Sequence, residues 1–414
     1  METKTLDSST QFLHQLYEAV PDGERINLCL QCGACSGACP FGYVMVYPPH
    51  LMITAMRAGL IDDVLACDTA WMCVSCYACT QVCPARIPVT AGLTTHIKEE
   101  MLLAGNVPTE LQDALEKAGR YFNPLGESPR KRAEWTTGLG FDVPLMAKLQ
   151  RPVDVLWFVG DYGSYHPSAL NATRSLARIL HALGIDFAIL GPEEVSDGDS
   201  LRLAGELGLF EMLAEKNAAA FSKYEFNEMI TADPHAYNAI RSEYPKLGIN
   251  YPIRHYTEFL LERTESLQPL LTKEVQAQVV FHDPCYLGRV NGIYEAPRQL
   301  LDLIPGIERQ EMSHAYENSL CCGGGGGGMW LDGFRWEKSK ARISEWRVRE
   351  AVSALGQTTV EELGSQNGHR KVLAVACPYE PSRFEDAAKA LPTAGGLEVR
   401  EIAELLAAAM GMEA

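Results

Sequence analysis

One arrangement of cysteines occurs twice near the amino terminus and constrains this chain of 414 residues more than any other feature. Each copy has the spacing C-x2-C-x2-C-x3-C followed by proline: Cys29, Cys32, Cys35 and Cys39, then Cys73, Cys76, Cys79 and Cys83. Three thiolates two residues apart bind three irons of a cubane from one loop, and in two-cluster proteins the fourth cysteine binds the other cluster. The spacing therefore predicts two [4Fe–4S] clusters, one on Cys29, Cys32, Cys35 and Cys83 and one on Cys73, Cys76, Cys79 and Cys39.

Other uses of paired cysteines do not account for this spacing. C-x2-C pairs also build zinc ribbons, and a single pair can be a redox dithiol. Neither alternative explains a third and a fourth cysteine at a fixed distance, twice. Cys67 lies between the runs but outside both, and because a lone cysteine is usually a small apolar residue we leave it out of the site.

Composition and charge narrow the compartment and the partners. Hydrophobic residues make up 47% of the chain and charged residues 21%, which is typical of a soluble globular protein. The net charge of -17 repels phosphate backbones and anionic lipids, so we expect no nucleic-acid partner and no binding to a membrane surface, and the apolar stretches predict no direct membrane span. The longest apolar stretches, such as Leu405 to Met410, fall far short of the roughly 20 residues that cross a bilayer. The polar start, Met1 to Thr10, has no secretion signal, which predicts a cytoplasmic protein with reduced thiols.

The length suggests several domains, and the pattern changes along the chain. Residues 1–110 are predicted to form a small α-helical ferredoxin domain, with apolar residues at helical spacing over Pro49 to Ala58 and Thr94 to Leu103. Residues 111–151 are polar and rich in turn signals, which predicts a linker. From Pro152 on, short apolar runs alternate with helical stretches, which predicts an α/β domain with a mostly parallel sheet.

This second domain is predicted to consist of two pseudo-repeats, residues 152–268 and 269–414. The run from Trp157 to Asp161 matches the run from Phe281 to Cys285, because each closes a strand and precedes a helix. Ile230 to Pro234 matches Ala374 to Pro378 in the same way. Each half is then one α/β unit.

The second half contains another set of cysteines, Cys285, Cys321, Cys322 and Cys377. All four fall at strand-to-helix turns or in loops, which converge at the carboxyl ends of parallel strands. We therefore expect a third [4Fe–4S] cluster there. The glycine run Gly323 to Gly328 fits either a flexible loop or backbone that approaches a bulky cluster, and we favour the second interpretation. Because the run follows a cysteine pair rather than a strand, it is not a dinucleotide-binding motif.

Polar residues flank Cys285. A general acid or base role can be written for His282, Asp283 or Arg289, but we expect them to orient the cluster ligands and tune the potential. His235 and His314 are weaker candidates.

These motifs resemble the D subunit of heterodisulfide reductase and its relatives, in which a ferredoxin-like part precedes a cysteine-rich part with CCG motifs. Residues 29–35 (CLQCGAC) and 47–60 are similar to the smaller, ferredoxin-like C subunit of that enzyme, and residues 282–289 (HDPCYLGR) and 318–323 (NSLCCG) to its CCG part. In that family each CCG repeat supplies five cysteines, and the complete set can hold a non-cubane [4Fe–4S] cluster that cleaves disulfides.

The chain departs from this pattern in both halves. The first set of positions holds no cysteine: Asp161, Ser196, Asp197, Asp233 and Ala236. The resemblance therefore implies no cluster in the first half. In the second half Glu380 takes the fifth position, which implies a cubane or a cluster with one unusual ligand. If the halves are duplicated, the three aspartates meet in space, where we expect a solvated remnant pocket rather than a site for a hard cation.

The resemblance implies an iron–sulfur electron-transfer subunit of a multi-subunit oxidoreductase. Its partners would be a flavoprotein of the kind that forms the A subunit of heterodisulfide reductase, an electron-transfer flavoprotein, or a membrane quinone-linked subunit. Two alternatives stay open. The CCG cluster itself can be catalytic and cleave a disulfide, or the carboxyl-terminal part can be a docking scaffold with free cysteines and no cluster.

Overall fold

The computed structural model describes residues 6–149, 151–356, 370–394 and 396–412, so the first five residues of the polar amino terminus lie outside it. The chain forms two compact units, each assembled from separate stretches. The first unit contains Met1–Asp113, Ser200–Leu207 and Gly323–Ile343. The second contains Ala114–Asp199, Gly208–Cys322 and Ser344–Ala414. The four consecutive domains expected from the sequence remain a prediction, since the two units interleave along the chain.

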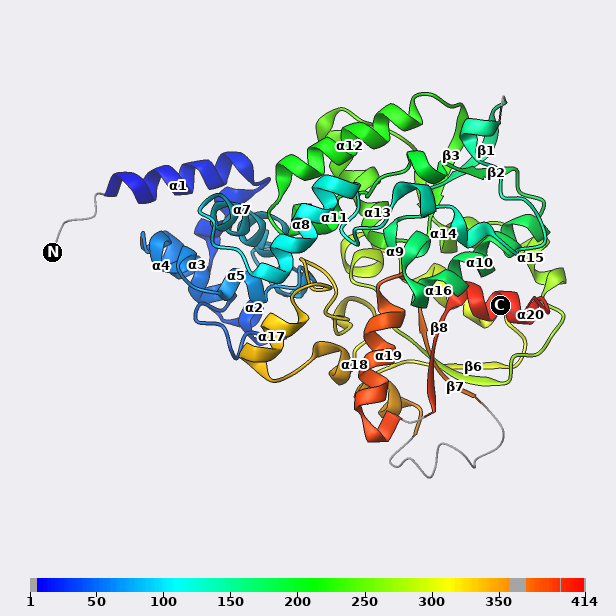
Figure 1. The fold of residues 1–414 in the computed structure, drawn as a ribbon. Coiled ribbons are helices and arrows are strands. Elements are labelled where there is room, and N and C mark those ends of the chain that lie inside the picture. The colour runs from blue at the N-terminus through cyan, green and yellow to red at the C-terminus, as the bar shows by residue number, and fades with distance from the viewer. Residues whose placement is uncertain (1–5, 150, 357–369, 395, 413–414) are drawn as a thin grey trace. The chain divides into compact units, whose positions relative to one another are not determined.

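The amino-terminal stretch of the first unit is built from short helices, and its described residues form no strand up to Leu103 (Figure 1). Pro49 starts α3, where its fixed φ suits the first helical turn and its missing N–H is not needed. The helices are α1 (Leu6–Ala19), α2 (Ala34–Gly37), α3 (Pro49–Arg57), α4 (Ile61–Leu65), α5 (Thr69–Met72), α6 (Ala78–Gln81) and α7 (Thr95–Leu103). Later segments add the end of α11 (Asp199–Leu203) and α17 (Asp332–Ser339), and α8 (Thr109–Tyr121) runs from the first unit into the second.

The second unit contains two four-stranded sheets, and every pairing between their strands is parallel, which confirms the predicted parallel sheet. The strand orders are β2-β1-β3-β4 and β6-β5-β7-β8. The strands are β1 (Val153–Trp157), β2 (Phe187–Ile189), β3 (Phe226–Thr231), β4 (Ile253–His255), β5 (Ala277–Phe281), β6 (Ile307–Gln310), β7 (Arg370–Val375) and β8 (Leu397–Glu401). The central strands are apolar because both faces of a parallel sheet are covered.

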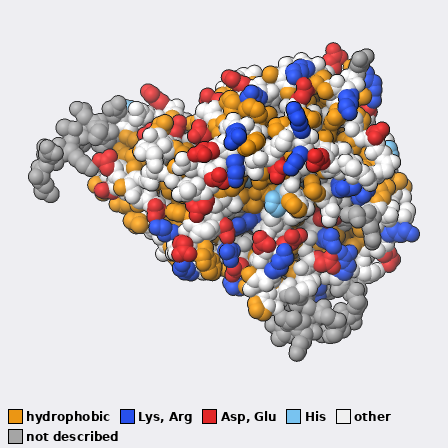
Figure 2. Space-filling view, viewed as in Figure 1, with side chains coloured by type: hydrophobic (Ala, Val, Ile, Leu, Met, Phe, Trp, Pro, Cys, Tyr) orange, Lys and Arg blue, Asp and Glu red, His pale blue; other side chains and the backbone are white. Residues whose placement is uncertain are grey.

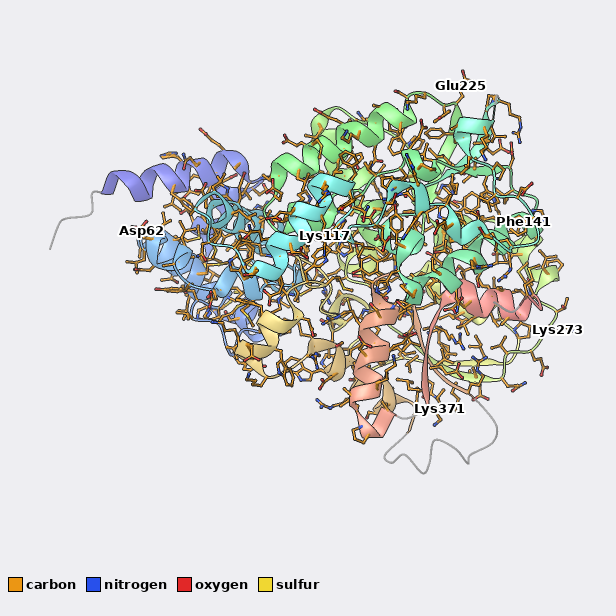
Figure 3. All side chains as sticks on the ribbon, viewed as in Figure 1. Asp62, Lys117, Phe141, Glu225, Lys273 and Lys371 are labelled. Atoms are coloured by element: carbon orange, nitrogen blue, oxygen red, sulfur yellow. The ribbon has the colours of Figure 1, made fainter. Side chains whose placement is uncertain are left out.

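Helices cover both sheets and join them through one hydrophobic core. Helix α10 (Pro167–Ala182) of the first sheet packs against α20 (Ile402–Ala409) of the second. At its end His181 stacks on Phe141 of the preceding segment, which is labelled in Figure 3, and ring centroids of the pair lie 4.0 Å apart. The remaining α-helices are α9 (Asp161–Tyr165), α12 (Leu207–Phe221), α13 (Pro234–Asn238), α14 (Tyr256–Leu261), α15 (Thr264–Leu267), α16 (Glu295–Asp302), α18 (Ile343–Ala354) and α19 (Glu380–Ala390).

Figure 2 shows how charged side chains are distributed on one face of the protein. On the face in Figure 2, acidic and basic side chains are interspersed rather than gathered by sign. None of the helices in the described part of the chain has both the length and the hydropathy that a bilayer crossing requires.

Candidate iron–sulfur centres

The two amino-terminal cysteine loops have the same backbone shape. Gln31 and Gly33 of the first loop adopt left-handed conformations with φ of 56° and 78°, and Ser75 and Tyr77 of the second do so with φ of 51° and 62°. Successive amides in alternating right- and left-handed conformations form concave anion-binding nests, a geometry common at iron–sulfur sites. A left-handed tyrosine costs about 1–3 kcal/mol, and such strain is concentrated at functional sites.

The first set of cysteines, which we call site 1, surrounds one cavity. Its members are those that the motif assigned to one cluster: Cys29, Cys32, Cys35 and Cys83. The side-chain amide of Gln31 donates a hydrogen bond from Nε2 to the sulfur of Cys29 at 3.0 Å. Cys32 is exposed, and Leu30 beside it is 73% exposed, so site 1 borders on solvent.

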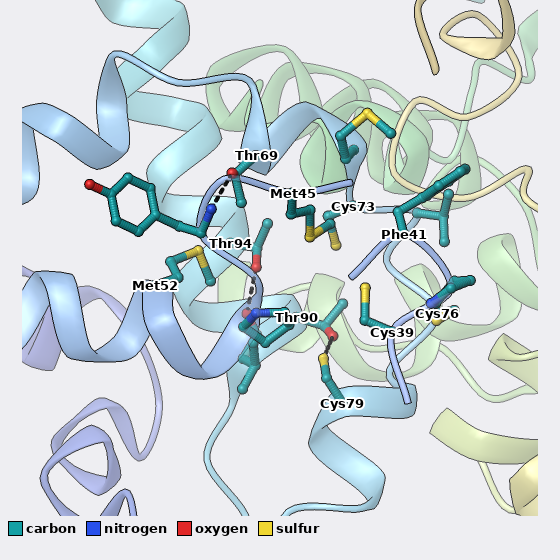
Figure 4. Close-up of a pocket in the computed structure, with 16 residues that line it drawn as sticks. Cys39, Phe41, Met45, Met52, Thr69, Cys73, Cys76, Cys79, Thr90 and Thr94 are labelled. Atoms are coloured by element: carbon teal, nitrogen blue, oxygen red, sulfur yellow. Dashed lines mark hydrogen bonds between the residues drawn. The ribbon is translucent and has the colours of Figure 1, made fainter. Parts of the chain in front are cut away.

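The second set, site 2, lies around a second cavity and consists of Cys39, Cys73, Cys76 and Cys79. Their side chains converge on one space (Figure 4). The Thr90 hydroxyl lies 3.1 Å from the sulfur of Cys79, and the Ser75 amide donates to the sulfur of Cys73 at 3.4 Å. The structure thus groups the eight cysteines as the crossed assignment requires.

The electrostatics of both sites suit metal-bound thiolates. Burial raises the pKa of Cys39 well above that of a free thiol, and the charges of Cys79, Cys76 and Cys73 raise it further. Burial and the neighbouring Cys83 and Cys29 likewise raise the pKa of Cys35. Such packed thiols do not ionise together without a positive partner, whereas bound metal ions deprotonate coordinating thiols outright. Four converging sulfurs with nearby amide donors therefore fit an iron–sulfur cluster.

Two buried cations lie beside site 2, and the sequence reasoning missed both. Lys98 has no exposed surface, and its ammonium donates to the carbonyls of Cys73, Leu203 and Gly326 at 3.1–3.2 Å. The Arg335 guanidinium also donates to the Cys73 carbonyl, at 2.9 Å. Burial lowers the pKa of Lys98 to about 8. The three-residue spacing of Lys98 from buried Met101 on α7 is the signal that could have found it.

The glycine run approaches the loop of site 2 closely. Gly326 has a φ of 58°, and a β-carbon there would lie 2.5 Å from the Ser75 hydroxyl and 2.9 Å from the Cys73 carbonyl. Only glycine fits this position without a shift. The close approach is to the backbone of the cysteine loop, and it lies within the first unit.

The third set, site 3, belongs to the second unit, where Cys285, Cys321, Cys322 and Cys377 are all buried. Cys285 follows β5, and Cys377 follows the adjacent strand β7 at the same edge of the sheet. A hydrogen bond with Cys321 and burial raise the pKa of Cys285, and burial with the Glu380 charge raises that of Cys377. The sulfur of Cys322 lies within 4.8 Å of ligand atoms of His282 and Glu380.

Asp283 and Arg289 hold the loop that leads to Cys321. Asp283 forms a two-pronged ion pair with Arg298 at 2.6 and 2.9 Å, and accepts from the Tyr316 amide at 2.8 Å. Arg289 donates to the carbonyls of Glu317 and Ser319. These contacts are structural. Among the other candidates, His314 pairs with Glu350 at 3.0 Å, and Cys67 contacts the carbonyl of Val64 at 3.1 Å.

In the first half of the second unit, the positions that correspond to site 3 form a buried carboxylate cluster. The Arg132 guanidinium, 2% exposed, binds Asp161 at 2.5 Å and Glu194 at 2.7 Å. Burial raises the pKa of Asp197, and the Asp233 charge raises it further, so these carboxyls lie near each other as expected. The pocket is not the solvated remnant that we expected, because its acids are buried and two of them, Asp161 and Glu194, pair with Arg132 of the preceding segment.

Aromatic residues connect the two halves of the second unit by equivalent contacts. Tyr162, which follows Asp161, packs on Tyr379 with ring centroids 4.3 Å apart. Tyr286, which follows Cys285, stacks on His235 at 4.0 Å. In each pair, one residue directly follows Asp161 or Cys285, which are equivalent positions in the two halves. The other residue lies two places after Cys377 or Asp233, which are also equivalent positions.

Comparison with known proteins agrees with this geometry. Residues 25–87 match the 4Fe–4S dicluster domain, and residues 155–241 and 279–356 match the cysteine-rich domain designated CCG. The chain is therefore an iron–sulfur protein of the 4Fe–4S type. The D subunit of the dihydromethanophenazine:CoB–CoM heterodisulfide reductase of Methanosarcina barkeri is 30% identical over 85% of this chain and 79% of its own length. The chain belongs to the family formed by this D subunit and related iron–sulfur oxidoreductases.

Longer relatives are equally similar. A probable iron-sulfur-binding oxidoreductase, FadF, of Bacillus subtilis is 31% identical over 84% of this chain and 48% of the relative. The EtfAB:quinone oxidoreductase of Syntrophomonas wolfei is 29% identical over 86% of this chain and 49% of the relative. The chain thus spans about half the length of these two curated relatives.

Proposed function

We propose that this chain is an electron-transfer subunit of an iron–sulfur oxidoreductase, in which clusters at sites 1 and 2 exchange electrons with a third cluster at site 3. The observation that carries the proposal is the grouping of eight cysteines around two cavities in the crossed pattern of a two-cluster ferredoxin. Site 3 adds four buried thiols, and two of them, Cys285 and Cys377, follow the adjacent parallel strands β5 and β7.

Site 1 is the proposed point of exchange with a partner. Cys32 is exposed there, and Leu28 and Leu30 beside it are 57% and 73% exposed. We propose that the cluster at site 2 passes electrons between site 1 and site 3. The glycine run that begins one residue after Cys322 belongs to the compact unit of sites 1 and 2, which supports a relay that continues to site 3.

The partner we propose is a flavoprotein, because the relative from Syntrophomonas wolfei is named an EtfAB:quinone oxidoreductase. An electron-transfer flavoprotein would pass electrons one at a time to site 1. At the other end would stand a quinone-linked subunit, or a flavoprotein like the A subunit of heterodisulfide reductase. All 13 cysteines are free of disulfides, which supports a reducing compartment such as the cytoplasm.

We also propose that the second unit arose by internal duplication. The two sheets share one strand order, and the CCG model matches both halves. The paired aromatic contacts support the same origin. On this proposal the first half lost its thiolates and now has only a structural role.

Anaerobic iron and sulfide counting tests the proposed function. Three [4Fe–4S] clusters give about 12 irons per chain, and Cys322→Ala should reduce the count to about 8. The scaffold alternative predicts about 8 irons for both proteins. Reduction of the wild-type chain by a reduced electron-transfer flavoprotein, followed by rapid-freeze spectroscopy, then shows whether site 1 receives electrons from that partner class.

A further inference from the structure

Glu380 has a buried carboxylate whose surroundings call for a ligand. It is the first residue of α19, three positions after Cys377, and is 1% exposed. Its Oε2 atom is buried without a hydrogen-bond partner among the described residues. A buried carboxylate oxygen without a partner costs several kcal/mol unless it binds a proton, a cation or a metal.

The groups around Glu380 offset this cost only in part, through the Ala376 amide and the charge of Arg347. Nε2 of His282 lies 3.1 Å from Oε1, yet it is also without an aligned hydrogen bond. The buried Arg347 guanidinium contacts His282 rather than Glu380, donating from Nε to Nδ1 of His282 at 3.0 Å. Within 4.8 Å of the carboxylate lies the sulfur of Cys322, a second potential ligand.

The protonation of His282 decides which residues of this group are available to iron. Arginine can only donate, so Nδ1 of His282 must be the acceptor and carries no proton. In the neutral ring the proton then sits on Nε2, which faces Glu380 and has no free lone pair for a metal. Arg347 is itself fixed by the carbonyl of His314 at 2.7 Å and by Glu350 at 2.6 Å. These hydrogen bonds hold the His282 ring in one orientation beside the Glu380 carboxylate.

We propose that Glu380 is an oxygen ligand to one iron of the site 3 cluster, and that His282 and Arg347 position its carboxylate. This inference rests on the proposed third cluster. It assigns the cluster one hard oxygen donor beside its thiolates, and it makes His282 a positioning residue rather than a ligand. An iron that carries an oxygen ligand differs electronically from irons that carry only thiolate ligands.

The test compares the full-length wild type with Glu380→Gln, Glu380→Cys and, as a control on the exposed side of α19, Asp386→Asn. Iron content, Mössbauer parameters and electron paramagnetic resonance of the reduced protein are recorded for each. Glu380→Gln should change the signal of one cluster only and leave the other two unaltered. Glu380→Cys should keep about 12 irons but shift the same signal, because a thiolate replaces the oxygen. Asp386→Asn should match the wild type.

Several results would overturn the inference. If Glu380→Gln has the wild-type spectra, Glu380 is not a ligand, although the third cluster stands. If Glu380→Gln loses the cluster and Glu380→Cys does not restore it, the residue is needed for folding and not for ligation. A nitrogen hyperfine coupling that disappears in His282→Gln would make His282 the ligand instead. A wild-type count of about 8 irons would instead remove the proposed function itself.

Discussion

Lys98 is a fully buried cation whose ammonium donates three hydrogen bonds to backbone carbonyls. One of these carbonyls belongs to Cys73 in site 2. Because carbonyl groups are neutral, these hydrogen bonds do not neutralise the positive charge of Lys98, and this charge acts on the site 2 cluster. A positive charge favours the reduced, more negative cluster and so raises its potential. The corresponding cation at site 1 is Arg57, which donates to the Cys29 carbonyl at 3.4 Å but is exposed, so water screens its charge and the two clusters should differ in potential.

We expect Lys98→Met to lower the midpoint potential of the site 2 cluster by on the order of 50 mV, about 1 kcal/mol for a charge several ångströms away. Potentiometric titration followed by electron paramagnetic resonance measures it. Lys338→Met is the control, since Lys338 is exposed and pairs with Asp68 at the surface. Equal potentials in both variants would contradict this role for Lys98.

The buried guanidinium of Arg132 stabilises the folded protein. It neutralises Asp161 and Glu194 in a buried network, and removal of one partner from such a network leaves unpaired buried charge. Arg132→Met should cost about 3–5 kcal/mol in urea denaturation, while iron content stays unchanged. Arg151→Met removes an exposed pair with Asp186 and should cost less than about 1 kcal/mol.

A double variant sharpens this comparison. Glu194→Gln in the Arg132→Met background removes one of the two orphaned charges and should recover part of the loss. If Arg132→Met is no more destabilising than Arg151→Met, the carboxylates are protonated in the native protein and the network is not ionic.

Some residues of the sites could be predicted from the sequence, and others could not. Three cysteines of each ferredoxin set followed from spacing, because one loop holds them, and the fourth followed from the crossed pattern of two-cluster proteins. Arg335 donates to the carbonyl of Trp71, 264 positions earlier, and no local pattern encodes such a contact. Arg132 was equally hidden, since a single arginine in a polar segment looks like a solvated side chain.

At the scale of elements, the helix α20 begins with a capping arrangement that responds to pH. The Glu401 side chain accepts from the Ala403 amide at 2.6 Å, and Glu404 accepts from the Glu401 amide at 3.0 Å. Burial raises the pKa of Glu401 to about 8, and the Tyr256 hydroxyl donates to the same carboxyl. The folded protein therefore holds a proton at Glu401 that the unfolded chain releases at neutral pH.

The sign of the effect follows from that difference. Because the folded pKa is the higher one, stability from this group falls as pH rises towards and through 8, by about 2 kcal/mol between pH 6 and pH 8. Glu401→Gln keeps an oxygen acceptor for the Ala403 amide but cannot titrate, so its stability should vary less with pH. Urea midpoints at both pH values measure the difference, with exposed Glu265→Gln as control. Parallel pH profiles for all three proteins would refute the assignment.

Elements differed in how well the sequence predicted them. The helix expected over Pro49 to Ala58 is α3, Pro49–Arg57, because proline marks its start. Central strands such as β5 were clear as apolar runs. The pattern did not single out β4, which has three residues, or β6, whose side chains are only half-buried at alternate positions. Edge strands carry a weak signal since one side of the sheet edge faces solvent.

At the scale of the whole molecule, the two units should depend on iron to different degrees. Helices α2 and α6 have four residues each, far below the roughly 12 at which an isolated helix becomes stable. Their geometry therefore depends on the clusters, whereas the sheets have a large apolar core. Anaerobic chelation should expose amides of residues 34–37 and 78–81 to hydrogen exchange while β1 and β7 stay protected. Equal deprotection of the strands would contradict this division.

The arrangement of the units along the chain was beyond sequence reasoning for a related reason. Residues 200–207 and 323–343 were placed by pattern with the α/β half, whereas they pack with the first unit. Their partners lie about a hundred residues or more away in sequence, so periodicity within a window says nothing of them. The strand alternation, in contrast, was a local property and predicted both sheets.

The interleaving of these segments limits how such a protein can be modified or recombined. A gene fragment that stops at residue 113 would encode the eight ferredoxin cysteines but omit the peptides that carry Leu203, Gly326 and Arg335, all of which contact the surroundings of Cys73. Exchange of the first unit between homologues therefore requires three pieces of sequence to be swapped together. Single-crossover chimaeras should lose site 2 before they lose site 1.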